Sequence, residues 1–298
     1  RQKAKSKNVM RKSAEKRQRQ PQRSRNQRLP IDRTRRNRLN LKNGLSHSSV
    51  ASDTLFDYAN RTKNGKSENG NGALARKPRL LDLFCCAGGA GVGYSRAGFE
   101  VVGVDIKPQP NYPLPFVQSD ALKLDQKFLR LFDAIHASPP CQSYSDLAKR
   151  NGNGHKWPRL IEPVREMLIE SGLPYVIENV DGAPLIDPVV LCGTMFKGLR
   201  VLRHRLFEAN FTIIPPQHKK HPKVHTFDKR KSHYGKTDDM RDFVQVTGGG
   251  NCSIAAARDA MGIDWMTKAE LNESIPPVYT QLIGRQLLRV LSHAKARK

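Results

Sequence analysis

Residues 80–93 read LLDLFCCAGGAGVG, and this stretch decides the fold class. The first five residues are apolar except for Asp82, which is the pattern of a short strand that is buried on both faces. A glycine-rich turn follows, and a helix-like segment then runs to Gly98. A strand that leads through such a turn into a helix is typical of α/β folds that bind nucleotides.

The alternation of apolar strand and helix repeats along the chain. Further strands are expected at 101–106, 132–137 and 174–177, and helices near 122–131 and 160–169. Buried strands that alternate with helices predict an α/β fold with a doubly wound, mostly parallel sheet. Residues 276–291 carry Val and Leu at near-helical spacing and are expected to form a helix that packs back on this sheet.

Basic residues are concentrated at the N-terminal end of the chain. The sequence has 52 Lys and Arg against 27 acidic residues, a net charge of +25, and residues 1–79 hold 23 of the basic and 5 of the acidic ones. We predict that residues 1–78 form a largely disordered basic arm, since they bury too little apolar surface to offset the entropy of ordering. A short helix is expected over 52–59. Such an arm attracts polyanions such as nucleic acid, although a solvated tail without a partner fits equally well.

The rest of the chain is expected to divide into three parts. Residues 79–211 would form a cofactor-binding and catalytic domain, and residues 212–270 a small irregular lobe that recognises the target. Residues 271–298 would form the C-terminal helix. The lobe is expected because residues 212–250 contain two adjacent prolines, scattered His and Lys, and three consecutive glycines, but no long periodic element.

The cysteines and the hydropathy exclude several classes of protein. Five cysteines without a CxxC pair fit neither a disulfide framework nor a zinc ribbon. The histidines at 218, 221 and 225 are interpreted as solvated, and no metal site is expected. No apolar run reaches the ~20 residues of a membrane span, and no secretory signal is evident. A cytoplasmic protein without a membrane partner is therefore predicted.

The glycine turn and the acid that ends the second strand form a candidate cofactor site. Glycines let the backbone approach a ligand closely, and Asp105, 17 residues after Gly88, could bind ribose hydroxyls. This arrangement fits NAD, FAD and S-adenosylmethionine about equally. The glycine spacing does not match the dinucleotide fingerprint cleanly, so a tight turn without a ligand also stays open.

Two strand ends carry candidate catalytic groups. Residues 137–145 read ASPPCQSYS, and the two prolines could hold Cys141 in a fixed pose beyond the strand end. The next strand delivers Glu178 and Asn179, polar residues that are unusual in a buried strand unless they have a partner. Neighbouring strand ends would bring the Cys141 thiol and the Glu178 carboxyl into one cleft.

Four motifs together resemble the DNA (cytosine-5) methyltransferase family, particularly its compact phage-type and bacterial members. They are DLF with its glycine turn from residue 82, PPCQS at 139–143, ENV at 178–180 and RHR at 203–205. The resemblance covers about residues 79–294. It implies the Rossmann-like fold of S-adenosylmethionine-dependent methyltransferases and transfer of a methyl group to carbon 5 of a flipped-out cytosine in double-stranded DNA.

The resemblance also implies a role for each matching residue. Cys141 would be the nucleophile that attacks ring carbon 6, and Glu178 would stabilise the adduct. Arg205 would hold the cytosine carbonyl oxygen, and Arg203 a phosphate or the loop. The residues that would bind S-adenosyl-L-methionine are Phe84, Gly88, Gly89, Asp105, Ile106, Asp120 and Pro139. Residues 151–154, which read NGNG, would suit a mobile loop that closes over DNA.

The sequence departs from the family pattern at three places. Cys86 stands where a glycine is usual, Val201 stands where Gln commonly opens the arginine motif, and Ile283-Gly284-Arg285 lacks the usual Gly-Asn pair. Alternatives are an amino-group methyltransferase suggested by Ser138-Pro139-Pro140, a transfer RNA cytosine-5 methyltransferase, and a catalytically silent nucleic-acid binder. A monomer is expected, with a restriction endonuclease as a conceivable partner.

Overall fold

The computed structural model describes residues 76–144, 156–222, 243–246 and 252–296. The predictions made for the N-terminal arm, for residues 151–154 and for His225 lie outside these residues.

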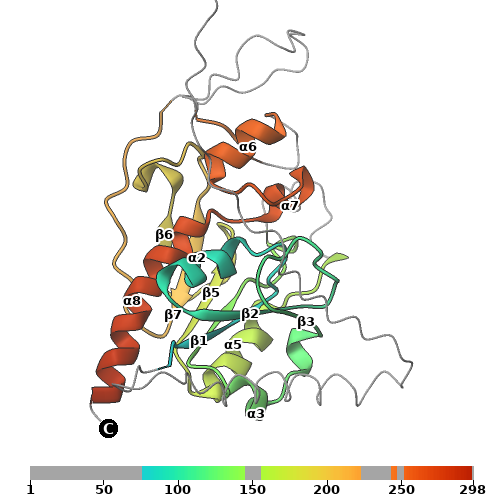
Figure 1. Ribbon diagram of the computed structural model, residues 1–298, viewed down its shortest axis with the longest axis vertical. Helices are drawn as coiled ribbons and strands as arrows, with labels where there is room; N and C mark the ends of the chain where they lie inside the picture. Colours follow the sequence, from blue (N-terminus) through green and yellow to red (C-terminus); the bar gives the residue numbers. More distant parts are fainter. Residues whose placement is uncertain (1–75, 145–155, 223–242, 247–251, 297–298) are drawn as a thin grey trace, which may run out of the picture. The chain divides into compact units, whose positions relative to one another are not determined.

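A mixed sheet of seven strands forms the centre of the described part, in the order β3-β2-β1-β4-β5-β7-β6 (Figure 1). The strands are β1 (Arg79–Leu83), β2 (Glu100–Asp105), β3 (Phe116–Gln118), β4 (Ala134–Ala137), β5 (Tyr175–Asn179), β6 (Val189–Leu191) and β7 (Arg205–Ala209). The strands from β3 to β5 pair in parallel, whereas β7 pairs antiparallel with both β5 and β6. The predicted α/β class with a mostly parallel sheet is confirmed.

Helices cover both faces of this sheet. The helices are α2 (Gly89–Ala97), α3 (Gln126–Leu129), α5 (Ile161–Ser171), α6 (Ile254–Met261), α7 (Lys268–Glu273) and α8 (Pro277–Ala296), with 3-10 turns η1 (Ala121–Lys123) and η3 (Gly193–Met195). The helix expected near 122–131 is instead split into η1 and α3. The physical reason is Asp125, whose carboxylate accepts from the N–H of Phe128 at 2.7 Å and so starts a new helix.

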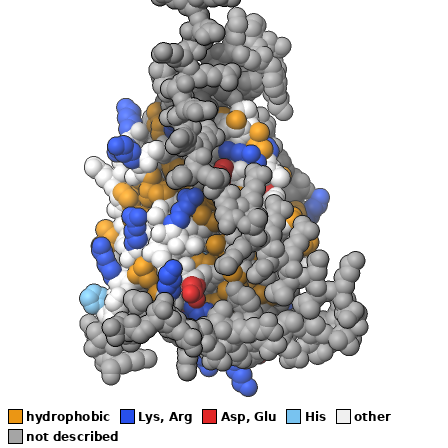
Figure 2. Space-filling model, viewed as in Figure 1, with side chains coloured by type: hydrophobic (Ala, Val, Ile, Leu, Met, Phe, Trp, Pro, Cys, Tyr) orange, Lys and Arg blue, Asp and Glu red, His pale blue; other side chains and the backbone are white. Residues whose placement is uncertain are grey.

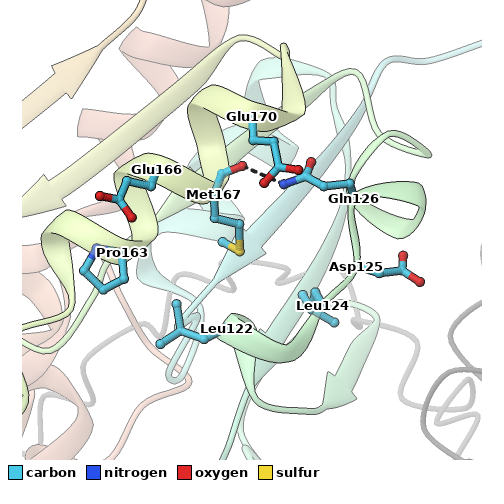
Figure 3. Close-up of a pocket in the computed structure, with 8 residues that line it drawn as sticks. All are labelled: Leu122, Leu124, Asp125, Gln126, Pro163, Glu166, Met167 and Glu170. Atoms are coloured by element: carbon cyan, nitrogen blue, oxygen red, sulfur yellow. Dashed lines mark hydrogen bonds between the residues drawn. The ribbon is translucent and has the colours of Figure 1, made fainter.

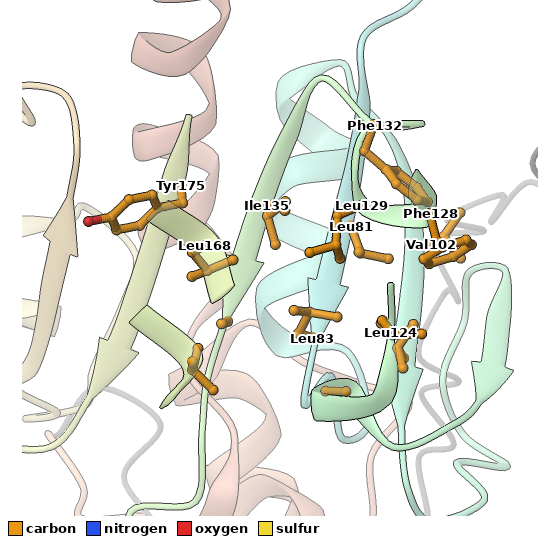
Figure 4. Close-up of a cluster of buried hydrophobic side chains, with 14 of the residues drawn as sticks. Leu81, Leu83, Val102, Leu124, Phe128, Leu129, Phe132, Ile135, Leu168 and Tyr175 are labelled. Atoms are coloured by element: carbon orange, nitrogen blue, oxygen red, sulfur yellow. The ribbon is translucent and has the colours of Figure 1, made fainter. Parts of the chain in front are cut away.

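Alternate residues of the buried strands supply two separate cores. Leu81, Val102 and Ile135 pack with α3 and α5, and Figure 4 shows this cluster. Their neighbours in sequence Leu80 and Val101 face the other way and pack with α2 and α8. Alternate residues therefore fill the cores on the two faces of the sheet, which explains why these strands are mostly apolar.

Helices α2 and α8 are in close contact because glycine stands where they meet. A Cβ at Gly93 would clash with the Thr280 hydroxyl and the Pro277 carbonyl, and a Cβ at Gly284 would lie 2.8 Å from that of Ala97. Gly284 belongs to the segment where the family's usual Gly-Asn pair is missing. Its role in this chain is helix packing, and helix α8 confirms the element expected at 276–291.

A third, smaller core joins α6 and α7 to the glycine turn. Met261 and Met266 are fully buried in it together with Val201, and Ala87 of the turn belongs to the same cluster. Val201 also forms a bridge with Val244. An apolar residue at position 201, where Gln is common in the family, is therefore part of the packing of this lobe. Helix α7 spans the predicted boundary at 270–271, and the division of the chain into domains stays a prediction.

None of the helices within the described ranges is both long and apolar enough to cross a bilayer.

Candidate active site

The carboxyl ends of β1, β4 and β5 bring together the predicted catalytic groups. The Ser138 N–H donates to the Leu83 carbonyl at 3.1 Å, which ties the segment after β4 to the end of β1. The Asn179 side-chain amide donates to the Pro139 carbonyl at 2.9 Å, which ties the same segment to the end of β5. Asn179 therefore fixes the Pro-Pro turn that carries Cys141, and this is the polar partner that its burial required.

Glu178 is the buried acid of this edge. Its carboxylate pairs with Arg205, with 3.0 Å between Oε1 and Nε, and accepts a hydrogen bond from the Ser138 hydroxyl. Burial raises the pKa of Glu178 above its ordinary value, while the Arg205 charge and the Ser138 hydrogen bond oppose this shift. A carboxyl held in this way keeps its proton to higher pH than an ordinary carboxyl.

The Cys141 thiol is half-buried and lies within the electrostatic reach of both partners of this ion pair. Burial raises the pKa of Cys141, Arg205 opposes the shift, and Glu178 reinforces it. The thiol form is therefore favoured in the free protein. Removing the negative charge from Glu178 would favour the thiolate, since only the arginine charges would then act on it.

A buried relay behind Glu178 was not recognised from the sequence. His136 lies in the middle of β4 and is fully buried, which lowers its pKa to about 3 and keeps it neutral. Tyr94 Oη lies 3.1 Å from His136 Nδ1, and His136 Nε2 lies 2.9 Å from Ser138 Oγ. Tyr94 can donate to His136, His136 to Ser138, and Ser138 to Glu178. The available signal was a histidine inside an otherwise apolar strand.

Arg203 and Arg205 have different surroundings although they are two residues apart. The Arg203 guanidinium is buried and donates to the carbonyls of Val246 and Asn272, both at 2.6 Å. Burial lowers its pKa to about 9. Of the two roles implied by the resemblance, these contacts favour the one in which Arg203 holds loops. Arg205 instead lies at the candidate catalytic edge, where it forms the ion pair with Glu178.

The end of β2 carries the candidate cofactor residues. The Asp105 carboxylate accepts from the backbone N–H groups of Cys86 at 3.0 Å and Lys107 at 2.9 Å, which fixes its position beside the glycine turn. The next residue, Ile106, is an apolar side chain with 62% of its surface exposed. An anchored acid beside an exposed apolar side chain fits a nucleoside, whose hydroxyls need acceptors and whose base needs an apolar surface.

The other residues of the candidate cofactor site lie nearby or have structural roles. Asp120 caps η1 by accepting from the Leu122 N–H at 3.1 Å. Phe84 has a positive φ of 56°, as has Gly88 with 89° at the start of α2. A Cβ on Gly89 would run into Ser274 and Ile275, so this glycine permits close packing of the chain before α8.

Asp82 is a further buried acid below the glycine turn. Tyr112 donates a 3.3 Å hydrogen bond to its Oδ2, whereas Oδ1 has no hydrogen-bond partner among the described residues. Burial raises the pKa of Asp82 to about 8. A buried carboxyl with an unsatisfied oxygen at this edge is compatible with a polar or cationic ligand over the turn, so the donor set fits S-adenosylmethionine.

Cys86 stands in a strained conformation within the glycine turn. Its φ is 44°, in the left-handed region that disfavours every residue except glycine, and its side chain is exposed. The backbone N–H still makes the bond to Asp105. Position 86 therefore needs the conformation of the family's usual glycine, and the cysteine occupies it at an energetic cost.

Replacing Cys86 by glycine is expected to raise the free energy of unfolding by about 1 kcal/mol, since the left-handed strain exceeds the extra flexibility that glycine gives the unfolded chain. Thermal denaturation would measure this change. Cys86→Ala is the matched control, because it removes the thiol but keeps the Cβ. An equal gain from both substitutions would show that the sulfur, and not the backbone, carries the cost.

Trp265 and Glu270 make hydrogen bonds to residues around the candidate cofactor site. Neither contact is predicted from the sequence. The Trp265 indole N–H donates to the Ala87 carbonyl at 2.8 Å. The Glu270 carboxylate accepts from the Asn111 amide at 3.0 Å. Both partners are more than 150 residues away in sequence, so no local pattern could reveal these contacts.

A surface pocket of about 420 Å³ lies elsewhere, between the η1–α3 segment and α5 (Figure 3). Met167 and Leu122 line it together with the carboxylates of Asp125, Glu166 and Glu170. Three carboxylates repel a polyanion, so this pocket is unsuited to nucleic acid. On the face shown in Figure 2, by contrast, Lys and Arg side chains outnumber acidic ones.

Comparison with known sequences gives one family and several relatives. Residues 78–185 match the sequence profile of the C-5 cytosine-specific DNA methylases. The type II methyltransferase M.FnuDI of Fusobacterium nucleatum is 29% identical over 112 residues, which are 35% of this chain and 33% of that protein. The type II methyltransferase M.HgiGI of Herpetosiphon aurantiacus is 27% identical over 118 residues, 36% of this chain and 94% of that protein. The chain thus spans only a third of the length of the first relative.

Comparison with solved structures supports the fold. A candidate DNA modification methyltransferase encoded within a prophage of E. coli superimposes with a TM-score of 0.55 and 16% identity, over 72% of this chain and 100% of that one. The methyltransferase EhMeth of Entamoeba histolytica gives 0.50 and 14%, over 72% and 99%. At these identities the likeness concerns the fold alone.

Proposed function

We propose that this chain, whose residues 78–185 match the profile of the C-5 cytosine-specific DNA methylases, methylates carbon 5 of cytosine in double-stranded DNA. S-adenosylmethionine is the methyl donor. The observation that carries the proposal is the buried Glu178–Arg205 pair beside the half-buried Cys141 thiol, at the carboxyl edge of a parallel sheet. Ligands bind at this edge in open α/β folds.

Cys141 and Glu178 act together in the proposed reaction. The Cys141 thiolate forms a bond to ring carbon 6, the double-bond electrons shift toward nitrogen 3, and protonated Glu178 donates its proton there. Carbon 5 then becomes nucleophilic enough to take the methyl group, whose bond to the sulfonium sulfur breaks while nitrogen 3 returns its proton to Glu178. Loss of the carbon 5 proton to a base such as water restores the ring double bond and expels the Cys141 sulfur as the thiolate. The raised pKa of Glu178 favours its protonated form and so suits a proton donor.

Arg205 and the buried relay set the position and charge of Glu178. Arg205 opposes complete neutralisation of the carboxyl and would also reach the cytosine carbonyl oxygen. The Tyr94–His136–Ser138 chain reaches the carboxyl from within the sheet. A cytosine stacked in a duplex cannot reach a thiol at the edge of the sheet, so the base must be flipped out for the reaction.

Asp105, Ile106 and Asp120 are the residues that would hold S-adenosylmethionine, together with Phe84, the backbone of Gly88 and Gly89, and Pro139. When bound, it supplies an electrophilic methyl group on a sulfonium sulfur. Asp105 would accept from ribose hydroxyls, Ile106 would cover one face of the adenine, and Asp120 would accept from the adenine amino group.

Ile106→Ala is expected to weaken binding of S-adenosylmethionine about fivefold without changing stability. The reason is that the exposed side chain contributes about 1 kcal/mol of apolar contact only when the adenine covers it. Calorimetric titration measures the effect. Ile169→Ala on α5 is the control, since that side chain is 59% exposed and lies near the opposite end of the strands. If the Ile106 variant bound S-adenosylmethionine as tightly as the wild type, the proposed contact between Ile106 and the adenine would be wrong.

The decisive test is nucleoside mass spectrometry after incubation of the full chain with S-adenosylmethionine and unmethylated DNA, with transfer RNA in parallel. 5-Methylcytosine in the DNA is the expected product. A methyl group in RNA alone would overturn the substrate but keep the thiol chemistry. An N4- or N6-methylated base would overturn the Cys141 mechanism, and no methylation of either substrate would favour a silent nucleic-acid binder.

Three finer features belong to the same proposal. The N-terminal basic arm would add nonspecific phosphate contacts, so binding to DNA would weaken with salt. The protein would act as a monomer in the cytoplasm of a bacterial or phage-infected cell. A cognate restriction endonuclease would be a partner if the chain protects its own genome, as the type II names of its relatives suggest.

A further inference from the structure

Four potential metal ligands converge beside the catalytic edge. The Cys192 thiol, which follows β6, and the imidazoles of His204, His218 and His221 offer ligand atoms that all lie within 4.8 Å of one another. Cys192 is fully buried, His204 is half-buried, and the other two histidines are exposed. This cluster is separate from the residues assigned above to the reaction and to the cofactor.

Three of the distances within the cluster match those of a tetrahedral metal site. The three histidines direct the same atom, Nε2, toward the cluster. Nε2 of His218 lies 3.2 Å from Nε2 of His204 and 3.2 Å from that of His221, and His221 Nε2 lies 3.5 Å from the Cys192 sulfur. Zinc bonds of ~2.0–2.1 Å to nitrogen and ~2.3 Å to sulfur at tetrahedral angles place these atoms about 3.3 Å and about 3.5 Å apart.

Hydrogen bonds alone do not account for this arrangement. A neutral Nε2 carries either one proton or one lone pair, so it takes part in one good hydrogen bond. His221 and His218 each use Nε2 in two of the three contacts. At least one contact would therefore join two nitrogens without a hydrogen bond. A cation at the centre satisfies every one of these atoms at once.

The Cys192 sulfur has a hydrogen-bond donor beside it. The Thr194 hydroxyl donates to the Cys192 sulfur at 3.4 Å, and the same hydroxyl lies 3.5 Å from the carbonyl of Lys219. A hydrogen bond to a ligating sulfur from outside the first coordination sphere is usual in metal centres. It also links η3, which carries Thr194, to the segment that carries His218 and His221.

We propose that Cys192, His204, His218 and His221 bind one structural Zn²⁺ ion. Four protein ligands leave no open position, so the ion would hold the fold together and take no part in the chemistry. One sulfur and three imidazoles suit zinc better than magnesium or calcium, which prefer oxygen ligands. The ion would join the end of β6 and the segment after β7 to His204, which stands between Arg203 and Arg205.

The consequence for the reaction is indirect. Arg205 follows His204 directly, and its Nη1 donates to the His204 carbonyl at 2.8 Å. Fixing the His204 ring therefore helps to fix the guanidinium that pairs with Glu178. His204 is thus a positioning residue, and metal binding does not depend on the methylation reaction.

Metal analysis of the full chain, purified with a tag free of histidine, tests the proposal. We expect about one zinc per chain after dialysis, and at least about a tenfold lower content in the His218→Ala/His221→Ala double variant. Both replaced side chains are exposed, so the variant should still fold. His293→Ala, an exposed histidine on α8, is the control that should keep its zinc.

Cobalt substitution identifies the sulfur ligand. The Co²⁺-loaded wild type should show the absorption bands of a tetrahedral site together with a thiolate-to-cobalt charge-transfer band, and Cys192→Ser should lose the latter. Absence of bound metal in the zinc-reconstituted wild type would overturn the proposal. So would equal zinc in the double variant and the His293 control, whatever the methylation assay shows.

Discussion

Replacing Cys141 by alanine is expected to lower methyl transfer to DNA by at least about 10³-fold, because the covalent route to a reactive carbon 5 then disappears. The wild type should form a denaturant-stable complex with DNA that contains 5-fluorocytosine, since fluorine cannot leave carbon 5 as a proton does. The variant should form none. Methylation kinetics and denaturing gels measure the two effects.

Cys252→Ala is the matched control for this prediction. Cys252 is also partly exposed, but its sulfur contacts the Gln245 carbonyl and Lys268 in the lobe, and the proposed reaction does not involve it. This control should keep its activity and its covalent trapping. Residual methylation of Cys141→Ala within tenfold of the wild type would contradict a thiol nucleophile, provided that S-adenosylmethionine still binds equally well.

Glu178→Gln is expected to lower kcat by about 10²–10⁴-fold, the usual contribution of a positioned proton donor. The amide keeps the size of the carboxyl but cannot protonate nitrogen 3. Because burial raises the pKa of Glu178, its protonated form persists to higher pH than in an ordinary carboxyl. The wild-type kcat should therefore fall as the pH rises through this pKa, and the variant should lack this fall.

Glu208→Gln separates this effect from the loss of a buried charge. Glu208 lies on the neighbouring strand, is equally buried and pairs with Arg165 at 2.7 Å, so its substitution also breaks a buried ion pair. Both variants should be less stable, since each leaves an arginine without its partner. Only Glu178→Gln should lose catalytic rate. Similar losses of rate in the two variants would assign the Glu178 effect to stability.

The four central strands were predictable because each one is mostly apolar. Both faces are buried in β1, β2, β4 and β5, so most residues of these strands are apolar. They can therefore be recognised from local hydropathy, without knowing which strands pair with them. β3 and β6 are three residues long and lie at the edges of the sheet, where the signal is too short. β7 was missed because Arg205 and Glu208 interrupt its apolar pattern, and their partners lie on β5 and α5.

The candidate catalytic residues were predicted from their motifs, and the structure describes their surroundings. Cys141, Glu178 and Arg205 lie along one edge, whereas the guanidinium of Arg203 is used for two backbone carbonyls. The Tyr94–His136–Ser138 relay joins residues from α2 and from β4 with its following turn. No spacing in the sequence predicts the contact between Tyr94 and His136, which are 42 residues apart.

The sequence by itself determined the α/β class, the positions of the buried strands along the chain and the resemblance to the C-5 cytosine-specific DNA methylases, because these depend on local hydropathy and on motifs that are contiguous in the chain. Only the tertiary structure decided that Gly89 and Gly93 serve packing, that Cys86 is strained, and that Cys192 meets three histidines. From the sequence, two of these histidines, His218 and His221, are interpreted as solvated because no cysteine pair lies near them. A metal site assembled from separate segments depends on distances that arise only on folding, and these distances cannot be predicted from the order of the residues.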